Sequence, residues 1–140
     1  MKTDNYAPVA YLPNATSEGL HIHSKSWLQS LTMWQDEIRF FNSLLKKTTP
    51  HQYHTPEDSK EKVAVLEHLV RLEKHLVDNL KNDVVQHEKE LAALLQRERI
   101  FGEAEELKLY KEKHQHLYEE VQNFDVAFQE LKFLIYEFQK

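Results

Sequence analysis

Histidines are the residues of this chain whose type and spacing could do chemistry. His87 and His114 each interrupt a long series of apolar residues that recurs at spacings of three and four. Such spacing marks the buried face of a helix, so both imidazoles should point into the interior. Imidazole nitrogens bind Zn, Fe, Mn, Ni and Cu, and Asp83, one helical turn before His87, could orient its ring.

His21 is the third candidate ligand. Pro8, Pro13 and Gly19 predict an irregular arm over residues 1–23. An extended arm would rise about 10 Å in three residues and bring His21 to the level of His87. His21, His87 and His114 are therefore the candidate metal site. The competing interpretation is a hydrated polar layer without a cofactor, which we adopt while keeping a divalent transition metal as the alternative.

Glu73 is another polar residue within the apolar pattern. It falls opposite Phe128, where an unpaired carboxylate would cost several kcal/mol. Trp34 Nε1 and the Thr32 hydroxyl are the expected donors. We interpret Glu73 as a buried polar group that fixes the register of the helices. Alternatively, Glu73 and Trp34 anchor a small apolar ligand among the many aromatic side chains.

Motifs for catalysis are missing from the sequence. It contains no glycine-rich phosphate loop, no nucleophile elbow and no H-E-x-x-H. The Glu-x-x-His spacing of di-iron bundles occurs only from Glu18 to His21, beside Gly19 in the expected arm. We therefore expect a protein that is not an enzyme.

Two long helices must position these residues. The apolar spacing predicts helices over 57–99 and 103–139 that form an antiparallel hairpin around Gly102, with the reversal at Ile100 and Phe101. The two series pair layer for layer, so that His87 faces His114. The first series is Val63, Leu66, Val70, Glu73, Val77, Leu80, Val84, His87, Leu91 and Leu94, and the second is Leu107, Tyr110, His114, Leu117, Val121, Phe124, Phe128, Leu131, Ile135 and Phe138.

A shorter helix over 24–48 should pack on this hairpin. Ser24 and Ser26 are the candidate N-caps, and Lys46 and Lys47 suit the negative end of the helix dipole. The expected fold is all-α, an antiparallel bundle of three helices in one domain over 1–140, with the arm 1–23 packed on the bundle.

The short helix leaves one seam of the hairpin half exposed. This seam consists of Leu91, Leu94, Leu107 and Tyr110, and a contiguous apolar strip of that kind needs a cover. Either the arm covers it or a second copy completes a four-helix bundle. We expect the second arrangement, a homodimer.

Composition narrows the class of partners. The chain has 140 residues and a net charge of -5, and its Lys and Arg alternate with Glu, which argues against nucleic acid. No apolar stretch approaches the roughly 18 residues of a membrane span, and the start lacks an apolar leader. For these two reasons we expect a cytoplasmic protein, and we expect it to act through protein contacts. The alternatives are a metal-binding bundle and an apolar-ligand carrier. The absence of cysteine excludes disulfides and thiolate metal sites but leaves the redox compartment open.

Overall fold

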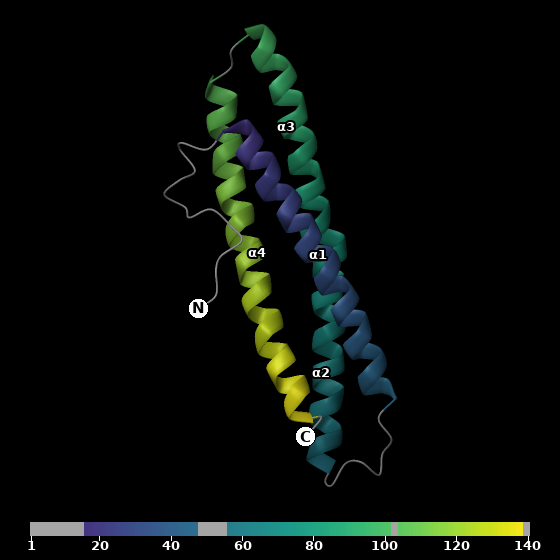
Figure 1. The fold of residues 1–140 in the computed structure, drawn as a ribbon. Coiled ribbons are helices and arrows are strands. Elements are labelled where there is room, and N and C mark those ends of the chain that lie inside the picture. The colour runs from purple at the N-terminus through teal and green to yellow at the C-terminus, as the bar shows by residue number, and fades with distance from the viewer. Residues whose placement is uncertain (1–15, 48–55, 102–103, 139–140) are drawn as a thin grey trace.

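The described part of the chain is built almost entirely from helices. The computed structural model describes residues 16–47, 56–101 and 104–138, which contain no strand. The elements are α1 (Ser17–Lys46), α2 (Pro56–His75), the π-helical turn η3 (Leu76–Leu80), α3 (Lys81–Phe101) and α4 (Ala104–Phe138). Because α2, η3 and α3 follow without a break, they form one rod, here called the α2–η3–α3 rod (Figure 1). The all-α class is confirmed, and the helices expected over 57–99 and 103–139 differ by only one or two residues at each end. Within these described ranges, no helix is long and apolar enough to cross a membrane.

Ionic contacts show how the helices lie along one another. His21 Nδ1 of α1 is 2.7 Å from Glu88 Oε1, whereas Arg39 Nε, farther along α1, is 2.8 Å from Glu73 Oε2. As α1 proceeds, its partners in the α2–η3–α3 rod therefore come from progressively earlier residues. On α4, Lys132 Nζ lies 3.3 Å from a carboxylate oxygen of Glu37 in α1.

The helix α1 begins at Ser17, seven residues earlier than the expected 24–48, so the irregular arm over 1–23 is wrong for its last residues. Thr16 is the N-cap, and its hydroxyl accepts a hydrogen bond of 3.0 Å from the Gly19 amide. A glycine in a helix costs only about 1 kcal/mol, which capping and the burial of Leu20 can offset. The expected arm residues 1–15 lie outside the described part of the chain.

This early start covers the seam that sequence analysis left open. Leu20 of α1 forms a buried cluster with Leu91, Leu94 and Tyr110, and Leu107 packs against that cluster. Their burial within one chain overturns the expectation of a half-exposed seam. A second copy is not needed to cover this surface.

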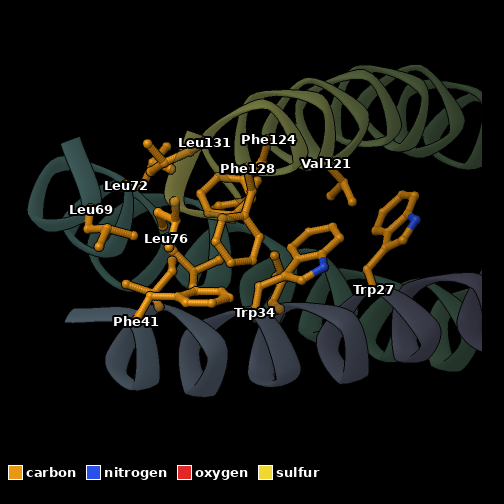
Figure 2. Packing of buried hydrophobic residues seen from close by; sticks show 14 of the residues in the cluster. Trp27, Trp34, Phe41, Leu69, Leu72, Leu76, Val121, Phe124, Phe128 and Leu131 are labelled. Atoms are coloured by element: carbon orange, nitrogen blue, oxygen red, sulfur yellow. The ribbon is translucent and has the colours of Figure 1, made fainter. Parts of the chain in front are cut away.

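The main core lies where α1, the α2–η3–α3 rod and α4 meet. Figure 2 shows the rings of Trp34, Phe41 and Phe128 pointing into the space between α1 and α4. Trp34 stacks on Phe124 with the ring centroids 5.4 Å apart, and Phe41 meets Phe128 edge to face at 6.5 Å. Aromatic pairs in these geometries add to the stabilisation that burial supplies.

The π-helical turn η3 changes the register of the hairpin. The Lys81 amide donates to the Leu76 carbonyl, a bond that spans five residues. Buried residues follow at three consecutive spacings of four from Leu72 through Leu76 and Leu80 to Val84. On a regular α-helix these steps would rotate the buried stripe by about 120°, and the wider turn absorbs that rotation.

The predicted apolar series is therefore correct after η3 and wrong before it. From the last residue of η3 onward, the expected residues are buried, namely Leu80, Val84, His87, Leu91 and Leu94. On the near side, the buried residues are Val65, Leu69, Leu72 and Leu76, each one position earlier than Leu66, Val70, Glu73 and Val77. Val63 and Val70 are exposed. The extra residue in η3 moves the whole preceding series by one position.

Glu73 lies at the surface for the same reason. Its carboxylate accepts a 2.8 Å hydrogen bond from the exposed Arg39, and Trp34 packs in the core against Phe124 instead of reaching it. The interpretation of Glu73 as a buried register residue or as a ligand anchor with Trp34 is wrong.

Candidate functional site: a buried histidine chain

The most unusual polar feature of the interior is a row of three histidines. His23 Nδ1 lies 2.8 Å from His114 Nε2, and His114 Nδ1 lies 2.9 Å from His87 Nε2. The three side chains are 7%, 0% and 2% exposed for His23, His114 and His87. His23 comes from α1, His114 from α4 and His87 from α3. Each of the three long helical rods, which are α1, the α2–η3–α3 rod and α4, therefore contributes one imidazole to this layer. We call the three residues the histidine chain.

Aromatic rings sandwich the histidine chain. His87 stacks on Tyr110, with centroids 3.9 Å apart and an interplanar angle of 5°. His114 stacks on Trp27 at 4.5 Å and 27°. Trp27 follows His23 by four residues on α1, so both side chains share one face of the helix. The early start of α1 therefore brings His23 into the layer.

Burial keeps the three imidazoles neutral at physiological pH. It lowers the pKa of His23 to about 4. It also lowers the pKa of His87 to about 4, with help from the positive charge of Lys113. His114 has a pKa of about 3, because burial acts together with the two neighbouring imidazoles. Removing charged groups from water disfavours their charged form, so protonation of this layer is costly.

Neutral imidazoles constrain the direction of the hydrogen bonds. Each neutral ring carries one N–H and one acceptor nitrogen, and His114 uses both of its nitrogens within the chain. If His114 accepts from His87, it must donate to His23. If it accepts from His23, it must donate to His87. The layer thus has two states of opposite direction, and a change between them moves a proton on every ring.

The phenol of Tyr110 is held neutral beside this layer. Burial, and next the negative charge of Glu88, raise the pKa of Tyr110 well above its ordinary value. The tyrosine therefore packs against His87 as an uncharged ring. Because the Tyr110 phenol is uncharged, it supplies no negative charge that would offset the cost of protonating the His87 imidazole.

The structure assembles two of the three candidate metal ligands. His87 and His114 lie side by side, as layer pairing predicts. His21 pairs with Glu88 at the surface, and His23, which was not among the predicted ligands, stands next to His114. The nitrogens of the histidine chain point at one another instead of at a common centre. Among the described residues, no group of three His, Asp, Glu or Cys side chains has the arrangement of a metal site.

Comparisons with known proteins add no assignment: no protein-family model, no curated protein and no solved structure matches the chain.

Proposed function

We propose that this chain is a non-enzymatic antiparallel three-helix bundle that acts through protein–protein contacts, first with a second copy of itself. The observation that carries this proposal is a group of exposed apolar side chains on α1 and α4. We call the group the α1–α4 patch, and it consists of Met33, Phe40, Val126, Phe133 and Tyr136.

The members of the patch lie on two helices that contact each other through Phe41 and Tyr136. Met33 and Phe40 are seven residues apart on α1, and Val126 and Phe133 are seven apart on α4, so each pair occupies one helix face. Phe41 connects the two helices, since its ring centroid is 5.5 Å from that of Phe40 and 5.9 Å from that of Tyr136.

The side chains of the patch are large, apolar and exposed to solvent. Each member of the patch is between 54% and 65% exposed. Exposed apolar residues scattered singly are ordinary, whereas a contiguous group marks an interaction surface. Aromatic residues and Met are also enriched in protein interfaces.

A second copy is the partner that fits this surface. The patch spans two neighbouring helices, so a two-fold axis through it would surround the apolar side chains with four helices, as in a four-helix bundle. The same two helices are joined by an ion pair, in which Lys132 Nζ of α4 lies 3.3 Å from a carboxylate oxygen of Glu37 in α1. Because that pair is neutral as a whole, two copies would meet there without repulsion between like charges.

The histidine chain supports this function by fixing how the three rods align. A polar layer whose members satisfy one another disfavours registers in which the same groups would be buried unpaired. Correct alignment of α1 with α4 is what creates the patch. We propose no catalytic step for the layer.

Neighbouring substitutions on α4 test the proposal. Phe133→Glu places a charge in the patch, and Leu134→Glu places the same charge at a position that is 52% exposed on another face of the helix. Light scattering should give twice the chain mass for the wild type and for Leu134→Glu, and the single chain mass for Phe133→Glu. Circular dichroism should show all three folded, since neither side chain belongs to the core. A wild-type monomer, or equal dissociation by both substitutions, would refute this interface.

A further inference from the structure

The histidine chain divides the buried interior into two unequal parts. On one side lies the main core, to which α1 contributes Trp27, Leu31, Trp34, Ile38, Phe41 and Leu45. On the other side lies the small cluster of Leu20, Leu91, Leu94 and Tyr110. Of the described residues of α1 that precede His23, Leu20 alone is buried. The first two turns of α1, residues 17–24, are therefore held by far less apolar burial than the rest of the helix.

Polar contacts add little to the attachment of these two turns. His21 Nδ1 lies 2.7 Å from Glu88 Oε1, but the His21 side chain is 53% exposed, and exposed ion pairs stabilise only weakly. The other carboxylate oxygen of Glu88, Oε2, is buried and has no hydrogen-bond partner among the described residues. Departure of the two turns would let water reach this oxygen. Within the interior, His23 Nδ1 holds the turns through its 2.8 Å contact with His114 Nε2.

Protonation of His23 would make this attachment unfavourable. A protonated imidazole can still donate to His114, but its positive charge is then buried in a side chain that is only 7% exposed. Burial holds the pKa of His23 at about 4 in the packed state. In water the pKa of a histidine is about 6.5. A state in which His23 faces water therefore binds a proton more readily than the packed state does.

We propose that the first two turns of α1 are an acid-sensitive attachment, which leaves the bundle when His23 takes up a proton while the helix from Trp27 onward stays packed. Trp27 marks the boundary because its ring stacks on His114 at 4.5 Å and belongs to the main core. Release uncovers the surface that Leu20 shares with Leu91, Leu94 and Tyr110 in the packed state.

Aromatic rings face His23 from the neighbouring helices. From α4, the ring centroids of His114 and Tyr118 lie 4.9 Å and 6.0 Å from that of His23. From α3, His87 adds an imidazole on the far side of His114. A cation at His23 would thus adjoin two further imidazoles, each of which burial keeps neutral.

The charged groups around the layer do not favour a cation in it. Lys113 of α4 lowers the pKa of His87, and Glu90 of α3 is paired with that lysine at 3.5 Å. Glu88 of α3 is paired with His21. Protonation of His21 would strengthen its pair with Glu88 and oppose release. An acid-driven release must therefore originate in the buried layer and not at His21.

The size and direction of the effect follow from His23. Because its pKa is lowered in the packed state, the attachment is strongest above pH 6.5 and weakens as pH falls toward 4. A pKa of about 4 when packed and about 6.5 when released raises the equilibrium constant for release by about 30-fold between pH 7.5 and pH 5.

Hydrogen exchange of the backbone amides measures this release on the full chain. After correction for the intrinsic exchange rate, the protection of residues 21–26 should fall by about 30-fold between pH 7.5 and pH 5. It should also stay below the protection of residues 34–41 at both values. His23→Asn places a side chain that does not titrate beside His114, and it should remove most of the fall. His21→Gln is the matched control, because it removes a surface histidine of the same two turns, and it should keep the fall.

The two tryptophans give a second measurement without a histidine substitution. Trp34→Phe leaves Trp27 as the single tryptophan, and Trp27→Phe leaves Trp34. On acidification the emission of Trp27 should shift first, since departure of His23 exposes one side of its ring, which lies 4.8 Å away between centroids. The emission of Trp34 and the helical circular dichroism should change only at lower pH.

Coincident acid transitions of Trp27, Trp34 and the helical signal would overturn the proposal, because α1 would then leave as one unit. So would a wild-type protection of residues 21–26 that does not fall at pH 5, or a fall that His23→Asn leaves unchanged. None of these outcomes bears on self-association, which rests on the α1–α4 patch.

Discussion

The three buried imidazoles of the histidine chain make the stability of the folded protein depend on pH. A histidine with a lowered pKa in the folded state binds protons more readily once unfolded. Its stabilising contribution is complete above the unfolded pKa of about 6.5 and is lost as pH falls toward the folded value. For His23 and His87 that value is about 4.

The free energy of unfolding should therefore fall steeply between pH 6.5 and pH 4. One pKa unit corresponds to about 1.4 kcal/mol, so three coupled histidines together should contribute on the order of several kcal/mol. Urea denaturation across this range measures the slope. The triple variant His23→Leu, His87→Leu, His114→Leu should flatten it, whereas His68→Gln on α2 should not. A wild-type slope equal to that of the triple variant would contradict buried neutral imidazoles.

Layer pairing is sufficient to predict that His87 meets His114, because both lie on the same side of η3 as the hairpin turn. His23 could not be found in this way. Its place depends on where α1 begins, and a start at Ser24 leaves it in an irregular arm. The Thr16 cap, with Glu18 in the first turn, is the signal that would have predicted the earlier start. Gly19 instead suggested an irregular arm. The free-energy cost of a glycine in a helix is, however, smaller than the gain from burying Leu20.

At the scale of the elements, one extra residue in η3 separates the predicted register from the observed one. An apolar pattern read as a regular α-helix has no way to accommodate three consecutive spacings of four. The competing series of Val65, Leu69, Leu72 and Leu76 was present in the sequence. The polar Glu73 inside the predicted series was the sign that the series was wrong, since a carboxylate seldom occupies a core position without a partner.

Deletion of Asn79 tests this account of η3. Asn79 is an exposed residue of the π-helical turn, and its removal should convert η3 to a regular α-helix while both flanking series keep their packing. The thermal midpoint should change little. Deletion of Lys89, an exposed residue of α3, should rotate Leu91 and Leu94 out of the core by about 100° and strongly destabilise the protein. Circular dichroism melting compares the two.

A larger drop in the thermal midpoint on deletion of Asn79 than on deletion of Lys89 would contradict the idea that η3 holds one residue that can be removed. Such turns occur mostly as single insertions in α-helices and are frequent at functional sites. Here η3 ends at Leu80, about two helical turns before His87. Its effect is to let two differently phased apolar stripes share one partner helix.

At the scale of the whole molecule, the three rods bury their aromatic interior and still leave the α1–α4 patch uncovered within one chain. Sequence analysis predicted self-association from the wrong surface, because it left out the first turns of α1. The seam around Leu94 is covered by Leu20. The patch could not be predicted from the sequence. The exposure of Phe40 and Phe133 depends on which faces of α1 and α4 pack together, and spacing along a single helix does not determine those faces.

The central claim is that two copies meet through this patch, and an intermolecular distance tests it most directly. The chain has no cysteine, so single substitutions allow a nitroxide label to be attached at one position. Val126→Cys labels the patch, and Val70→Cys is matched in residue type and has a similar exposure of 54% against 59%. Double electron–electron resonance should give a shorter distance between copies for the label at position 126 than for the label at position 70. No dipolar coupling at either position, or a shorter distance at position 70, would contradict the claim.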